Sequence, residues 1–220
     1  DDWRREAVDT FIHRLYDTIK VRKPHIKFGI SPFGIWRPGN PASIQGFDQY
    51  AELYADARKW FREGWVDYWT PQLYWPVNQV PQSFPVLLDW WTEQNLQQRH
   101  LWPGMSIGRK QGEAAVDETI NQIMITRGQV SDAPGTVHWS IGPLVNHPTL
   151  ARELLEGPYQ KPALVPPSPW LDARPPQPPR IDGVVQGDSL LVTWQPDTGE
   201  PVARWILTFG YGGQSDTYDI

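Results

Sequence analysis

Residues 53–76, LYADARKWFREGWVDYWTPQLYWP, hold side by side the two patterns that decide the fold of the first part of the chain. Apolar and aromatic residues repeat at helical spacing from near Asp48 to Phe61, and Gly64 follows where a left-handed C-terminal cap would end the helix. The next residues, WVDYWTPQLYW, form an aromatic run typical of a buried strand. We therefore predict one helix from Asp48 to this cap and a strand directly after it.

The same alternation of helix and strand extends on both sides of this stretch. Three further strands are predicted at HIKFGISPF, HLWPGMSI and GTVHWSIG, so that the strands end near Ser31, Pro71, Ser106 and Ser140. These ends are 40, 35 and 34 residues apart, close to the roughly 31 residues per unit of a (β/α)8 barrel. A doubly wound sheet is the alternative α/β fold, but no predicted strand is followed by a glycine-rich phosphate loop.

Four other helices complete the pattern, one of them with Ser83 as its predicted N-cap. Their predicted core-facing residues are Val8, Phe11, Ile12, Leu15 and Ile19; Val86, Leu87, Trp90 and Trp91; Val116, Ile120, Ile123 and Met124; and Leu150, Leu154 and Leu155. Four strands make half of a barrel, and an open four-stranded sheet would leave two unpaired edges. We therefore expect this chain to be a piece of a longer polypeptide.

Proline marks a change of organisation after residue 157. Nine of the 23 prolines fall in residues 158–179, where we predict an extended linker of polyproline character. Residues 180–220 show short alternating runs separated by turns at Gly187–Asp188 and at residues 197–199, which predicts part of an all-β sandwich. The predicted domains are thus residues 1–157, the linker 158–179 and the partial sandwich 180–220.

Composition excludes several kinds of chemistry. The 220 residues include no cysteine, which removes disulfides and thiolate nucleophiles, and 20 Lys and Arg against 25 Asp and Glu give a net charge of −5. This acidic balance argues against a nucleic-acid partner. No HExxH motif occurs, and neither a metal nor another cofactor is predicted.

Three motifs carry a family resemblance: SPFGIWRPG (31–39), residues 53–76 quoted above, and PVLLDWW (85–91). They resemble the C-terminal half of bacterial glycosyl hydrolase-like family 10 proteins, and the resemblance runs from about residue 2 to residue 157. It implies that the four strands are strands 5–8 of a TIM-type barrel. It also implies that an acidic, catalytic motif at the end of strand 4 lies upstream of Asp1. The segment with PPQPP, LLVTW and RWILTFGY resembles the start of a fibronectin type III module.

Barrel enzymes place their sites at the carboxyl ends of the strands. Aromatic faces there can stack on sugar rings, while amide, hydroxyl and guanidinium groups can bind sugar hydroxyls. The predicted substrate-binding residues are Trp36, Arg37, Gln72, Tyr74, Trp75, Ser106 and Trp139, with Ser31, Phe33, Arg109 and Ser140 beside them. The alternatives are structural: Trp36 and Trp75 as hydrophobic plugs, and Arg37 as a brace for its loop.

A glycosidase normally needs two carboxyl groups beside the scissile bond, and none of these strand ends carries one. Asp67 is the nearest and is a weak candidate, because it precedes Gln72 by five residues; we favour a buried structural role, paired with an arginine or a backbone amide. His138 is interpreted as a hydrogen-bonded core histidine rather than a base.

Together these features predict a glycoside hydrolase that acts on a bacterial cell-envelope or extracellular polysaccharide, with its catalytic carboxylates upstream of residue 1. The alternative is a non-catalytic glycan-binding barrel protein, and a barrel hydrolase of amides is the third choice. The expected partners are a polysaccharide or oligosaccharide and the missing upstream half-barrel of the same polypeptide. The family resemblance implies an extracytoplasmic location. No oligomeric state is predicted.

Overall fold

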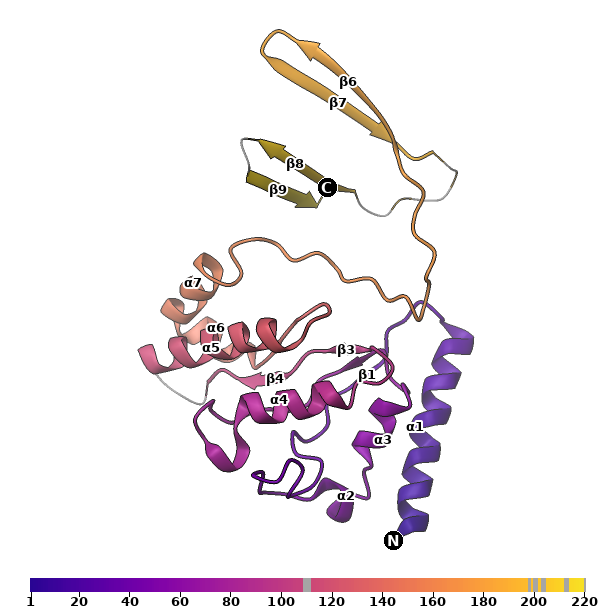
Figure 1. The fold of residues 1–220 in the computed structure, drawn as a ribbon, viewed down its shortest axis with the longest axis vertical. Coiled ribbons are helices and arrows are strands. Elements are labelled where there is room, and N and C mark those ends of the chain that lie inside the picture. Colours follow the sequence, from indigo (N-terminus) through magenta and orange to yellow (C-terminus); the bar gives the residue numbers. More distant parts are fainter. Residues whose placement is uncertain (109–111, 198, 200–201, 203–204, 212–213, 220) are drawn as a thin grey trace. The chain divides into compact units, whose positions relative to one another are not determined.

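The computed structural model describes residues 1–108, 112–197, 199, 202, 205–211 and 214–219. The chain divides into two compact units, Asp1–Lys161 and Pro162–Ile220. The first is a mixed α/β unit, as predicted, and the second contains strands without helices among its described residues (Figure 1).

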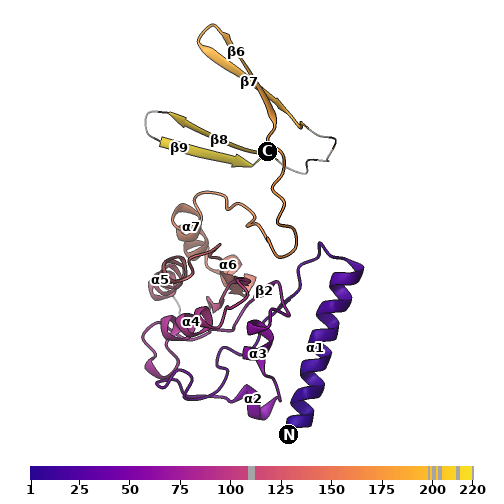
Figure 2. The ribbon, with the colours of Figure 1, turned by 45° about the vertical axis from the view of Figure 1, so that its right-hand side comes forward.

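Helices and strands alternate along the first unit (Figures 1 and 2). In chain order they are α1 (Asp2–Arg22), β1 (Gly29–Ile30), α2 (Gln49–Glu52), α3 (Ala57–Arg62), β2 (Tyr68–Trp69), the 3-10 helix η1 (Val80–Gln82), α4 (Phe84–Glu93), β3 (His100–Leu101), β4 (Gly104–Ser106), α5 (Glu113–Gln129), β5 (Val137–Trp139), α6 (Ile141–Asn146) and α7 (Pro148–Glu156).

All strand pairs of this unit are parallel among the described residues. Strands β1, β2 and β3 form one sheet and β4 and β5 another. Parallel bridges from Phe33 to Gln72 and from Gln72 to Gly104 continue the pairing beyond the first sheet. The predicted strand HLWPGMSI therefore corresponds to β3 and β4 in succession.

Prolines explain why the regular strands are so short. The bridges place Pro32, Pro71 and Pro103 at the same level of three neighbouring strands, one residue before each bridging position. Each proline still accepts a hydrogen bond from the next strand, but it has no N–H to donate to the ladder. The regular pairing is interrupted there, close to the carboxyl ends of the strands.

The core lies between the strands and helices α3, α4 and α5. Phe61 of α3 stacks on Trp69 of β2 at 5.1 Å between ring centroids, and Trp91 of α4 contacts both rings. All three side chains are fully buried, and Ile123 of α5 belongs to the same cluster. Burial of such large aromatic surfaces is the main stabilising term for this unit.

The single helix predicted from Asp48 to the Gly64 cap is wrong. Residues 48–63 form two helices, α2 and α3, because Asp48 and Asp56 each accept a hydrogen bond from a backbone N–H and so begin a separate helix. Tyr54, between them, has a positive φ of 55°. The predicted left-handed cap is confirmed, since Gly64 has a φ of 73°.

Four predicted core residues are exposed instead: Phe11 by 62%, Val86 by 36%, Met124 by 54% and Leu155 by 64%. Each lies at the edge of its apolar stripe, and the helices bury narrower stripes than the spacing predicted.

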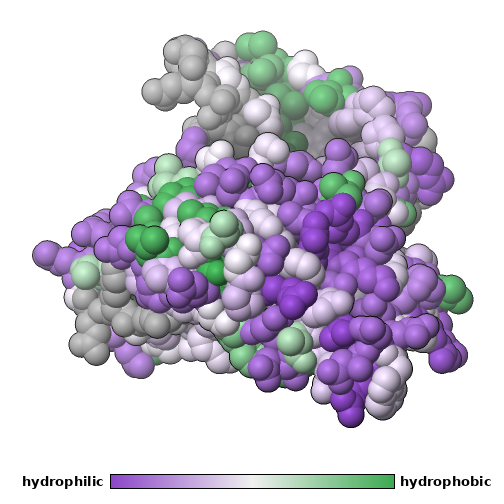
Figure 3. All heavy atoms as spheres, turned by 60° about the horizontal axis from the view of Figure 1, so that its bottom comes forward, coloured by the Kyte–Doolittle hydropathy of each residue, from purple (hydrophilic) through white to green (hydrophobic). Residues whose placement is uncertain are grey.

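Ser83 stands at the N-cap position of α4, but its hydroxyl donates to the carbonyl of Val77 at 3.0 Å instead of capping the helix. Figure 3 shows apolar side chains, coloured green, that form small patches on the surface.

The second unit begins with residues 162–179, which form neither helix nor strand. Strands β6 (Arg180–Gln186) and β7 (Ser189–Gln195) pair as an antiparallel hairpin, and so do β8 (Ile206–Tyr211) and β9 (Gln214–Asp219). The predicted turn at Gly187–Asp188 is present, with a φ of 60° at Gly187. Thr198 of the other predicted turn lies outside the described residues, and the fibronectin type III assignment stays a prediction.

Candidate functional site

Side chains that follow the strands meet at one edge of the first unit. Parallel pairing sets Phe33 beside Gln72 and Ser106 beside Trp139, because the carboxyl ends of parallel strands lie together. Further contacts connect these positions, and we call the connected group the strand-end cluster. It comprises Ser31, Phe33, Gln72, Tyr74, Trp75, Ser106 and Trp139.

Hydrogen bonds and ring contacts hold one side of the cluster. The amide nitrogen of Gln72 donates to the carbonyl oxygen of Ser31 at 3.1 Å and lies 3.4 Å from its hydroxyl. Trp75 meets Phe33 edge-on, with 5.6 Å between ring centroids and 81° between ring planes. Gln72 and Trp75 are half-buried, so each keeps exposed surface toward solvent. Trp139, on β5, is 64% exposed.

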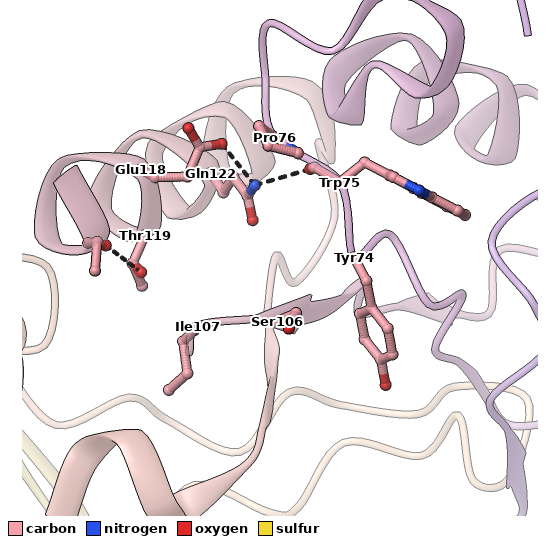
Figure 4. Close-up of a pocket in the computed structure, with 9 residues that line it drawn as sticks. Tyr74, Trp75, Pro76, Ser106, Ile107, Glu118, Thr119 and Gln122 are labelled. Atoms are coloured by element: carbon pink, nitrogen blue, oxygen red, sulfur yellow. Dashed lines mark hydrogen bonds between the residues drawn. The ribbon is translucent and has the colours of Figure 1, made fainter. Parts of the chain in front are cut away.

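A narrow hollow adjoins the cluster (Figure 4). It is lined by Tyr74, Trp75, Pro76, Ser106, Ile107, Ala115, Glu118, Thr119 and Gln122, and it has room for little more than a water molecule. Partial burial raises the pKa of the Tyr74 phenol, which therefore stays neutral near pH 7. The hollow brings together three predicted site residues, Tyr74, Trp75 and Ser106.

Glu118 and Gln122 of α5 were not predicted as site residues. The Glu118 carboxylate accepts from the N–H of Val77 at 2.7 Å and from the Gln122 amide at 2.8 Å. That amide also donates to the carbonyl of Trp75 at 3.1 Å. Their spacing of four residues was a signal in the sequence, since it sets two polar side chains on one helix face. Helical spacing alone does not show that this face is covered.

Trp36 belongs to a separate group on the loop after β1. Its indole N–H donates to Asp56 at 3.1 Å, and its ring stacks on Trp90 with 5.9 Å between centroids. Tyr50 meets the ring edge-on, and the Arg58 guanidinium lies 5.0 Å from its centre. These contacts are those expected for a packed tryptophan that connects the loop to α3 and α4.

Arg37 contacts the same loop and helix α2. Its Nε lies 3.2 Å from Asp48, the residue that caps α2, and its guanidinium lies 4.6 Å from the centre of the Tyr50 ring. The side chain keeps 41% of its surface exposed. The brace interpretation accounts for these contacts, and the exposed part leaves the guanidinium accessible. Arg109, named with it from the sequence, lies outside the described residues.

Asp67 lies at the other end of β2, immediately before the strand. It is fully buried, and its carboxylate pairs with Lys20 at 2.5 Å and accepts from the N–H of Phe28 at 2.6 Å. The Tyr16 hydroxyl lies 3.3 Å away, and burial together with this carboxylate raises the pKa of Tyr16 to about 12. Asp67 thus has an ion pair and a backbone hydrogen bond, as expected for a structural residue. The backbone amide was predicted from the sequence, and the charged partner is a lysine instead of the predicted arginine.

His138 contacts side chains beyond its strand. Its Nε2 lies 2.6 Å from the Tyr159 hydroxyl and 3.3 Å from the Thr136 hydroxyl, and burial lowers the pKa of the imidazole. This is the hydrogen-bonded environment of the favoured interpretation. In the part of the chain that the structure describes, no three His, Asp or Glu side chains gather as metal ligands. No described helix has the length and apolarity of a membrane span.

A parallel α/β unit with aromatic, amide and hydroxyl groups at the carboxyl ends of its strands is typical of glycosidase-like proteins. The sequence model of the family described as Glycosyl hydrolase-like 10 matches residues 1–120, more than half of the chain. The chain belongs to this family, and this match confirms the glycosyl hydrolase-like resemblance noted in the sequence.

Two curated relatives carry the same kind of name. Glycosyl hydrolase YngK of Bacillus subtilis (strain 168) is 36% identical over an alignment of 198 residues, which covers 84% of this chain and 39% of YngK. Glycosyl hydrolase DigH of Escherichia coli (strain K12) is 38% identical over 96 residues, 42% of this chain and 22% of DigH. The chain therefore spans well under half the length of either relative.

Proposed function

We propose that the first unit is the C-terminal half, strands 5–8, of a (β/α)8 barrel. The parallel order of the strands and the helices between them support this proposal. On β5, Val137 and Trp139 are exposed while His138 between them is half-buried, so one face of this strand is covered and the other is uncovered among the described residues. That uncovered face would line the barrel interior once an upstream half closed the sheet. Residues 180–220 would begin a fibronectin type III-like sandwich.

The activity that this site supports best is hydrolysis of a glycosidic bond. The observation that carries the proposal is the strand-end cluster, in which Trp75, Trp139 and Tyr74 offer ring faces and edges beside Gln72 and Ser106. Sugar rings have apolar faces and a rim of hydroxyls, and this combination of groups complements both. In a complete barrel the cluster would lie at the mouth, where barrel enzymes act.

The chemistry itself needs two carboxyl groups, one to protonate the leaving oxygen and one to act as base or nucleophile. The strand-end cluster, as described, contains none. The catalytic pair would therefore come from the upstream half, and this half would contribute sugar contacts. A bacterial cell-envelope or extracellular polysaccharide is the proposed substrate, which requires an extracytoplasmic location.

A non-catalytic glycan-binding protein is the second candidate. The specific observation in its favour is the same lack of a carboxylate among the described residues of the cluster. Such a protein would use the cluster for weak binding and the second unit for a further contact, linked for avidity. The two candidates differ in one measurable property, the release of reducing sugar ends.

The test uses the full-length polypeptide that contains this chain. Purified bacterial cell-wall glycan and a panel of extracellular polysaccharides are assayed for release of reducing ends and for sedimentation of the protein with the insoluble polymer. Trp75→Ala is compared with Trp65→Ala, a matched tryptophan that stacks on His13 near the opposite end of β2. If Trp75→Ala diminishes the release of reducing ends and Trp65→Ala does not, the hydrolase is supported. Binding of the polymer without release supports the second candidate. If the protein neither releases reducing ends nor binds the polymer, both candidates are rejected.

A further inference from the structure

Helix α5 presents two polar side chains to the backbone that follows β2. From this arrangement we infer that Glu118 and Gln122 are positioning residues, which hold the backbone of residues 75–77 and so orient Trp75 toward bound sugar. The inference rests on the proposed function for the identity of the ligand. The contacts themselves stand without it.

The two side chains bind backbone groups of opposite polarity. Glu118 accepts from the N–H of Val77 at 2.7 Å, and Gln122 donates to the carbonyl of Trp75 at 3.1 Å. Pro76 lies between these groups and has no N–H of its own. The Glu118–Gln122 bond of 2.8 Å holds the two side chains against each other. The segment is thus fixed on both sides of its proline, and we call this arrangement the α5 clamp.

A third bond completes the hold on this segment. The Ser83 hydroxyl donates to the carbonyl of Val77 at 3.0 Å, so both polar backbone groups of Val77 are bound. Bonds that involve an ionised carboxylate are shorter and stronger than neutral ones. The backbone of residues 75–77 is therefore more firmly held than a loop that carries only its own hydrogen bonds.

Burial of polar groups indicates that the clamp has a purpose beyond packing. Gln122 is 6% exposed, and Thr119 and Thr126 on the same face of α5 are 3% and 1% exposed. The two threonine hydroxyls donate back to carbonyls of α5 itself, whereas the Gln122 amide reaches across to Trp75. An apolar side chain would cover this face without the cost of desolvating an amide. It could not bind the carbonyl of Trp75.

The clamp acts on the side chain of Trp75 through its backbone. In Figure 4 the indole leaves the segment on the side away from Glu118 and Gln122. It then meets Phe33 edge-on at 5.6 Å between centroids. Backbone bonds on one side and a ring contact on the other leave the indole little freedom, so it is pre-organised before a sugar binds. Pre-organisation of this kind raises affinity because less motion is lost on binding.

Variants of α5 separate the clamp from helix stability. Glu118→Ala and Gln122→Ala remove its two side chains, while Glu118→Gln keeps an oxygen that can accept from Val77. Glu113→Gln and Asn121→Ala are matched controls at exposed positions of the same helix. Each variant is made in the full-length polypeptide labelled with 5-fluorotryptophan, and Trp75→Phe assigns the fluorine resonance of Trp75.

We expect Glu118→Ala and Gln122→Ala to shift and broaden the Trp75 resonance, and the two controls to leave it unchanged. On the polysaccharide that the wild type cleaves, KM should rise about tenfold, equivalent to about 1.4 kcal/mol, while kcat stays within about twofold. Glu118→Gln should restore most of both properties. A merely structural role would lower the melting temperature without this split between KM and kcat.

An unchanged Trp75 resonance in folded Glu118→Ala and Gln122→Ala would overturn the inference, as would equal changes in Glu113→Gln. If the alanine variants do not fold, the Trp75 resonance is compared between Glu118→Gln and Gln122→Glu. Gln122→Glu loses the N–H donor to Trp75 and sets a second carboxylate against Glu118, so the inference requires a larger change in this variant. If the wild type neither cleaves nor binds any polysaccharide, the proposed function fails. The fluorine spectra still show whether the clamp orders Trp75.

Discussion

The two ends of β2 differ sharply although Asp67 and Gln72 lie only five positions apart. At the amino end, the Asp67 carboxylate is fully buried and paired with Lys20. At the carboxyl end, Gln72 is half-buried, and its amide bonds to Ser31 while keeping exposed surface. The residue before β2 is thus buried and ion-paired, and the one after its carboxyl end is partly open to solvent; under the proposed function the first serves stability and the second ligand binding.

The largest effect on stability should come from the amino end. Asp67→Ala should lower the free energy of unfolding by about 3–5 kcal/mol, because it leaves the Lys20 ammonium partly buried without its carboxylate. Urea unfolding followed by tryptophan fluorescence measures the loss. Asp17→Asn, at a carboxylate with 61% of its surface exposed, is the control and should change stability by less than about 0.5 kcal/mol. Equal losses in the two variants would remove the distinction drawn here.

A pH dependence should come from the same end of the sheet. Burial lowers the pKa of His100, at the start of β3, so the folded state favours the neutral imidazole. The unfolded state binds the proton as pH falls through about 6.5, and stability should therefore decrease from that pH downward. Melting temperatures at pH 7.5 and 5.5 should differ less in His100→Gln than in the wild type.

His138 is the second histidine whose pKa is lowered by burial, so it contributes to the same slope. His138→Gln should flatten part of the remaining dependence. An unchanged pH dependence in His100→Gln would show that the burial of this imidazole at the amino end has no measurable effect on stability. His25, which is exposed, provides the matched control as His25→Gln.

The smallest effect on stability should come from the carboxyl end. Gln72→Ala removes a half-exposed amide that donates to the Ser31 carbonyl at 3.1 Å, and it should change the free energy of unfolding by no more than about 0.5 kcal/mol. The same variant should weaken polysaccharide binding, measured by sedimentation with the insoluble polymer. A stability loss as large as that of Asp67→Ala, with binding intact, would reverse the proposed division between the two ends of β2.

Much of this arrangement could be predicted from the sequence. The aromatic run that contains Trp69 and Tyr74 indicated a strand, and parallel order then predicted that the residues after each strand would share an edge. The cap at Gly64 followed from local chemistry alone, because glycine adopts a positive φ without strain. These features depend on residues that are close together in the chain.

Other features could not be predicted in this way. The helix break between α2 and α3 depends on whether the carboxylates of Asp48 and Asp56 turn back to cap a helix, and spacing does not decide that. Val77 and Glu118 lie 41 positions apart, and the α5 clamp depends on the intervening chain being folded so that the two meet. Trp36 likewise finds Asp56 and Trp90 through the tertiary packing of its loop.

The sequence by itself determined the α/β alternation, the pitch of its units and the family, and it predicted the edge where the proposed site residues lie. Helical and strand periodicity encode the alternation and its pitch locally, whereas the family follows from the resemblance of the motifs at residues 31–39, 53–76 and 85–91. The tertiary structure alone decided the partners of the covered polar residues: Lys20 for Asp67, whose burial the sequence indicated, and the carbonyl of Trp75 for Gln122. The physical reason is that a polar side chain has the same hydropathy whether it meets water or a distant backbone, and only the folded chain distinguishes the two.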